Sequence, residues 1–116
     1  MSSPSPQAPN ETIAQLEEIM GIEDSRALAA TYLKEYDGLF RTLISGPREE
    51  QHRAAHSLKS SSRHMGLTPL TQKFADIETR LLQSDGKLET QDIMSIMKTF
   101  EQLIPPLRKY AQASSQ

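Results

Sequence analysis

Residues 51–67 read QHRAAHSLKSSSRHMGL, and this stretch is the most informative part of the sequence. On a helical wheel at about 100° per residue, its small and apolar side chains share one broad face, namely Ala54, Ala55, Leu58, Ser61, Ser62 and Met65. This pattern predicts an amphipathic helix with a core-facing side. The helix should end near Met65, because Gly66 readily takes the left-handed backbone that follows a helix.

The opposite face of this helix is cationic. It carries His52, His56, Lys59, Ser60 and Arg63, all within about 100° of one another. A solvated helix face usually mixes charges of both signs, yet no acidic residue occurs in residues 51–70. This surface is therefore expected to favour an anion.

His56 lies at the centre of that cationic face. Its imidazole, with an unperturbed pKa of about 6.5, is largely neutral near pH 7. An unprotonated ring nitrogen can attack phosphorus, and the resulting N–P bond is labile enough to pass the phosphoryl group onward. Lys59, three residues later, can neutralise charge on the phosphoryl oxygens. The metal and carboxylate that such a transfer needs are expected on a partner protein.

The sequence AHSLKSSS at residues 55–62, followed by MGL at 65–67, resembles the signature of histidine-containing phosphotransfer (HPt) domains of two-component phosphorelays. The family pattern is Ala-His-x-Leu-Lys-Gly-Ser-Ser, then an aliphatic residue, Gly and a small or apolar residue. The resemblance implies that His56 is the phosphorylated residue, that Lys59 is its positive neighbour and that Gly66 ends the helix.

Two further positions follow from the resemblance. Ser60 stands where the family usually has Gly, so its side chain either crowds a docking partner slightly or donates a hydrogen bond to the phosphoryl group. Glu78 falls where the family often has a Gln or Glu, on the next helix, beside the phosphorylatable imidazole.

The resemblance also implies a function. A receiver domain of a hybrid sensor kinase, phosphorylated on Asp, would donate to His56, which would pass the group to the Asp of a response regulator. Docking would use the exposed face around His56 and apolar residues of the preceding helix, with Leu28, Tyr32 and Leu39 as candidates. No cofactor of its own is expected, Mg²⁺ is expected on the receiver, and nothing requires more than a monomer.

Two helices are expected before this stretch. Asn10 is a good N-cap for a short first helix that Gly21 ends. Asp24 or Ser25 can cap the second, which runs to about Ser45. Its core-facing positions are Ala29, Leu33, Tyr36, Phe40 and Leu43. Pro47 is then expected as the first residue of the third helix.

Two more helices are expected after it. The fourth would have Thr68 as N-cap, Pro69 as first residue, and an end at residues 85–86. Its apolar stripe is Leu70, Phe74, Ile77 and Leu81. Thr90 would cap the fifth, and residues 105–106, both Pro, should kink or end it. Its inward positions are Ile93, Met97, Phe100, Ile104 and Leu107.

The composition supports an all-α fold, because the 116 residues include only 5 Gly and no Val. Short connections imply antiparallel neighbours, so we expect an up-down four-helix bundle with a short additional N-terminal helix. One domain over residues 9–113 is expected, flanked by disordered tails at 1–8 and 114–116.

The composition also excludes several classes. A net charge of −2 from 13 basic and 15 acidic residues gives no overall field for nucleic acid. Without Cys there is no thiolate chemistry, and no apolar run approaches the roughly 20 residues that span a bilayer. No signal peptide is recognisable, so a cytoplasmic location is expected. Without a Gly-rich phosphate loop the chain should neither bind ATP nor phosphorylate itself, which makes it a phosphoryl carrier rather than a kinase.

Alternative interpretations remain open. The chain can be a four-helix adaptor that binds a signalling partner without phosphoryl transfer. His52 and His56, four residues apart, have a spacing that can chelate a metal, with His64 and Glu78 as further ligands. The neighbouring Lys and Arg side chains would repel a cation, however, so a metal-binding or nucleic-acid-binding protein has the weakest support.

Overall fold

The computed structural model describes residues 8–113, which form five helices and no strand. These are α1 (Glu11–Met20), α2 (Ile22–Ser45), α3 (Arg48–His64), α4 (Thr68–Leu81) and α5 (Thr90–Gln112). The all-helical class is therefore confirmed. Tails were expected at residues 1–8 and 114–116. Ala8, the last residue of the first, packs against the core, and residues 1–7 and 114–116 lie outside the described residues. None of the helices in the described range is long and apolar enough to cross a membrane.

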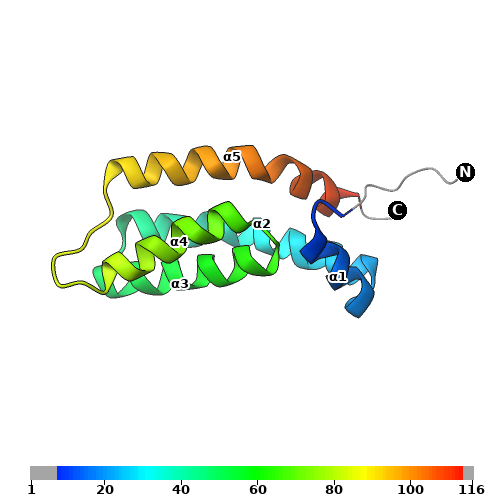
Figure 1. The fold of residues 1–116 in the computed structure, drawn as a ribbon, viewed down its shortest axis with the longest axis horizontal. Coiled ribbons are helices and arrows are strands. Elements are labelled where there is room, and N and C mark those ends of the chain that lie inside the picture. Colours follow the sequence, from blue (N-terminus) through cyan, green and yellow to red (C-terminus); the bar gives the residue numbers. More distant parts are fainter. Residues whose placement is uncertain (1–7, 114–116) are drawn as a thin grey trace, which may run out of the picture.

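Four of the helices enclose a common core (Figure 1). α3 lies beside α4 and also contacts α2, while α5 contacts α2 and α4; the short helix α1 packs on α2 at one end. The apolar stripe expected for α4 is buried along its whole length, as is the small and apolar face of α3 apart from half-buried Ser61. Phe74 of α4 is completely buried, and the centroid of its ring lies 6.2 Å from that of Tyr36 on α2.

Four of the five helix starts differ from the expected ones, by one to four residues. Asn10 caps α1 as expected, since its Oδ1 accepts a hydrogen bond from the Ile13 N–H at 2.9 Å. α2 begins at Ile22 rather than after Asp24 or Ser25, directly after Gly21, whose φ of 91° allows an abrupt turn. Pro47 is the N-cap of α3 and not its first residue.

The starts of the last two helices also shift by one position. Thr68 and Thr90 are the first residues of α4 and α5 rather than their N-caps. At α5 the capping position is taken by Glu89, which forms a reciprocal capping box with Asp92.

α4 ends at Leu81, about four residues earlier than expected. The guanidinium of Arg48, from the start of α3, donates hydrogen bonds to the carbonyl oxygens of Leu81 and Gln83. These carbonyls therefore have partners without a further helical turn. A Cβ on Gly86 would meet the Arg80 carbonyl oxygen, so the following loop folds back closely onto the helix end.

α5 continues through both prolines to Gln112, so the expectation that they end the helix is wrong. Two prolines remove two N–H donors, which would have bonded to the carbonyls of Glu101 and Gln102. Both of those residues are exposed, so water can satisfy their carbonyls. Beyond the prolines, Leu107 and Tyr110 are fully buried and hold the last turns against the core.

Met97 and Tyr32 lie in environments that differ from the expected ones. On α5 the buried residue is Ile96, while Met97 is 47% exposed, because the inward stripe runs one residue earlier at this point. Tyr32 was expected on the docking surface, but it is buried and its hydroxyl is hydrogen-bonded to Ser62 Oγ of α3 at 2.8 Å. Tyr32 therefore ties α2 to α3 from inside.

Candidate functional site

The candidate site is on the outer face of α3, at the middle of that helix. Ala54, Ala55 and Leu58 are buried and fix the helix against its neighbours. His56 points away from them, and 62% of its side chain is exposed. The helix thus presents this imidazole to solvent from a rigid support.

The end of α3 is fixed as well. Gly66 follows with φ of 73°, in the left-handed region that favours glycine. The Asn10 side-chain amide donates to the Met65 carbonyl oxygen at 2.9 Å, which satisfies a carbonyl at the helix end. The same side chain caps α1, so the start of α1 and the end of α3 are joined.

A carboxylate from α4 organises the site. Glu78 Oε2 lies 2.7 Å from His56 Nδ1, and Glu78 Oε1 lies 2.6 Å from Lys59 Nζ. Only 14% of the Glu78 side chain is exposed, and 22% of that of Lys59. The structure therefore brings together three of the residues singled out in the sequence, from two helices.

Glu78 is ionised at neutral pH. Partial burial alone would raise the pKa of its carboxyl, but the hydrogen bonds and positive charges of Lys59 and His56 together hold that pKa below its ordinary value. An ionised carboxylate only accepts hydrogen bonds. The proton of neutral His56 therefore lies on Nδ1, and the lone pair of Nε2 is free.

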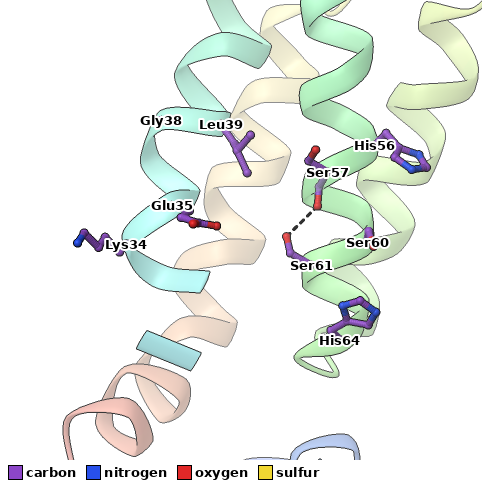
Figure 2. A pocket seen from close by; sticks show the side chains of 9 residues that line it. All are labelled: Lys34, Glu35, Gly38, Leu39, His56, Ser57, Ser60, Ser61 and His64. Carbon is purple, nitrogen blue, oxygen red and sulfur yellow. Dashed lines mark hydrogen bonds between the residues drawn. The ribbon is translucent and has the colours of Figure 1, made fainter. Parts of the chain in front are cut away.

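Ser60, the fourth residue singled out, is half-buried beside a groove between α2 and α3 (Figure 2). The groove has a volume of about 620 Å³. It is lined by Lys34, Glu35, Gly38 and Leu39 of α2 and by His56, Ser57, Ser60, Ser61 and His64 of α3. The Ser61 hydroxyl donates to the Ser57 carbonyl oxygen at 2.8 Å, so it is satisfied within the helix.

Of the apolar residues expected for docking, Leu39 lines this groove and Leu28 is 38% exposed. Lys34 and His64 also line the groove, and neither was predicted from the sequence to belong to the docking surface. For His64 the sequence did contain a signal. It lies eight residues after His56, and two residues at this spacing lie within about 80° of each other around a helix.

His52 lies one turn before His56, and its Nε2 is 3.9 Å from Glu78 Oε2. This nitrogen is buried and has no hydrogen-bond partner. Across residues 8–113, no three His, Cys, Asp or Glu side chains come together in a way that could hold a metal ion.

Comparison with protein families agrees with this geometry. Residues 10–110 match the model of a family described as the Hpt domain. No curated protein and no solved structure matches the chain. The matched segment includes His56, Lys59 and Glu78 and almost all of the five helices. The chain therefore belongs to the Hpt domain family, whose members have a histidine phosphotransfer role in phosphorelays.

Proposed function

We propose that the protein is a phosphorelay intermediate that carries a phosphoryl group on Nε2 of His56. The donor is the aspartyl phosphate of a receiver domain in a hybrid sensor kinase, and the acceptor is the Asp of a response regulator. The observation that supports this most directly is the contact between Glu78 and Nδ1 of the exposed His56 imidazole.

The transfer step follows from that contact. The lone pair of Nε2 attacks phosphorus, so an N–P bond forms while the P–O bond to the receiver aspartate breaks and its electron pair leaves on the carboxylate. The imidazole of His56 gains positive charge as the N–P bond forms. The negative charge of Glu78 on Nδ1–H stabilises that charge. Transfer to the second aspartate is the same step in reverse.

Lys59 and Ser60 have supporting roles in this proposal. Lys59 is held by Glu78 at the edge of the site, from which its ammonium can turn toward the phosphoryl oxygens. Ser60, half-buried beside the groove, presents a hydroxyl where most family members have no side chain. It is therefore a contact for the partner or for the phosphoryl group.

The remaining parts of the proposal come from the sequence. The helices form an antiparallel up-down bundle, the protein acts as a monomer in the cytoplasm, and it needs no cofactor of its own. The Mg²⁺ required for transfer is supplied by the receiver domain, which docks over the groove between α2 and α3.

The test is incubation with a radiolabelled, phosphorylated receiver domain. Wild type and His64→Gln, which keeps His56 and loses another exposed histidine of the same helix, should both become labelled; His56→Gln should not. The label should be lost in acid and survive alkali. Labelling of His56→Gln at the wild-type rate would contradict the assignment, and failure of wild type with a broad panel of receivers would favour an adaptor without phosphoryl transfer.

A further inference from the structure

The glycine at position 38 is not explained by the fold of the chain itself. Gly21 and Gly66 have φ angles of 91° and 73°, which other residues rarely adopt, and a Cβ on Gly46 or Gly86 would meet a backbone carbonyl oxygen. The φ of Gly38 is not positive, and a Cβ added there would have no atom from elsewhere in residues 8–113 within 4 Å. The position therefore has room for a larger side chain.

Gly38 also weakens the helix in which it lies. It is an interior residue of α2, and glycine is the poorest helix former apart from proline, because it gives the unfolded chain the most freedom. Alanine at this position would therefore stabilise α2, and no contact within the described residues opposes it. A residue that lowers stability without a reason in the fold points to a functional reason.

Gly38 lies in the wall of the groove that also contains His56 (Figure 2). The lining positions of α2 follow one another around the helix within about 140°, in the order Lys34, Gly38, Glu35 and Leu39. Gly38 therefore interrupts a row of long side chains. Leu39 is half-buried and packs against the core, so the gap at Gly38 has an apolar neighbour.

A receiver that phosphorylates His56 has to cover this groove. His56 and Gly38 both line it, and transfer requires the phosphorus to come within about 3–3.5 Å of the imidazole nitrogen. On the opposite wall, the Ser61 hydroxyl already donates to the Ser57 carbonyl oxygen. The space beside Leu39 therefore suits an apolar side chain of the receiver, which gains free energy when it leaves water.

We propose that Gly38 is a docking residue: an apolar side chain of the receiver domain fills the space left by its missing side chain when the receiver aspartate reaches His56. Gly38 supplies no group to the reaction, so it acts on how tightly the receiver docks and not on the transfer step. This inference rests on the proposed function, because the occupant is the receiver that phosphorylates His56.

The first test needs no receiver. Gly38→Ala should raise the folding equilibrium constant, measured by urea unfolding, by about fivefold, because alanine replaces glycine in a helix interior. Ala30→Gly is the matched control, since Ala30 is an exposed residue of α2 outside the groove, and it should lower the constant by a similar factor. A lower stability of Gly38→Ala would show that the fold requires this glycine and would overturn the proposal.

The second test is single-turnover acceptance at increasing concentrations of a phosphorylated receiver that labels His56. The receiver concentration that gives half the maximal rate should rise about fivefold in Gly38→Ala and about thirtyfold in Gly38→Leu, at a nearly constant maximal rate. Leu39→Gln makes the neighbour of the space polar and should raise this concentration about fivefold. Ala30→Leu enlarges a side chain outside the groove and should leave it unchanged.

The possible outcomes separate this proposal from the proposed function. Wild-type half-saturation in Gly38→Leu, or equal weakening by Ala30→Leu, would overturn the docking role while labelling of His56 upheld the phosphotransfer role. A lower maximal rate of Gly38→Ala at unchanged half-saturation would also contradict docking. If no receiver of a broad panel labels the wild type, the proposed function itself is refuted, and the role of Gly38 is refuted with it.

Discussion

The strongest test of the site's geometry is the replacement of Glu78, because this residue holds both His56 and Lys59 from another helix. Glu78→Gln keeps a hydrogen-bond acceptor for Nδ1–H and removes the negative charge. Glu78→Leu removes both. If the contact stabilises the transition state, the two variants should differ in a graded way.

The magnitude follows from the contact itself. The Nδ1–Oε2 distance of 2.7 Å and the small exposure of Glu78 indicate a charge-assisted hydrogen bond, which contributes about 2 kcal/mol. A neutral bond contributes about half of that. With the whole contribution expressed in the transition state, Glu78→Gln should accept about fivefold more slowly and Glu78→Leu about thirtyfold.

The assay is single-turnover acceptance from a phosphorylated receiver at pH 7.5, with the folded state of each variant checked by circular dichroism. Asp76→Asn is the matched control, since it removes a carboxylate from the exposed face of the same helix. Wild-type rates in Glu78→Leu would refute the argument that this carboxylate stabilises the imidazolium. Equal slowing in Asp76→Asn would show that the net charge of α4 matters and not the contact.

Three further predictions concern stability. Gly66→Ala should destabilise the fold by about 2–3 kcal/mol in urea unfolding, because it forces a left-handed backbone on Ala and its Cβ would displace the Asn10 side chain; an unchanged midpoint would contradict this. In a double-mutant cycle, Tyr32→Phe and Ser62→Ala should each cost about 1–2 kcal/mol, while the double variant should lose clearly less than their sum, because each single change leaves a buried hydroxyl unpaired; additive losses would argue against the bond. Because the folded pKa of Glu78 is depressed, the stability it contributes is present above its ordinary pKa of about 4.3 and is lost as the pH falls through the lower folded value. The stability gap between wild type and Glu78→Gln should therefore narrow in thermal unfolding as the pH falls below about 4.3, and a constant gap would contradict the pKa direction.

The sequence predicted which segments form helices better than it predicted where those helices begin and end. The apolar stripe of α4 and the two faces of α3 could be predicted because a helical period leaves a clear pattern. The early end of α4 could not, because it depends on Arg48, which is far away in the sequence and supplies the hydrogen bonds there. The continuation of α5 through its prolines likewise depends on tertiary packing, which local rules do not include.

The residues of the candidate site also differ in whether the sequence could predict their positions. His56 and Lys59 could be found from their spacing on one helix, and the family resemblance pointed to Glu78. The position of His52 against Glu78 could not be predicted, because a spacing of four residues fixes only its relation to His56. Its approach to α4 depends on how α3 and α4 pack.

The ring of His56 is oriented by a carboxylate that belongs to another helix, and this has a consequence for how such a protein evolves. A core substitution that changes the spacing of α3 and α4 therefore alters the position of Glu78 against the imidazole without touching the site. Selection can therefore adjust how firmly the imidazole is held through ordinary core variation. The surface that distinguishes one partner from another can stay unchanged in the meantime.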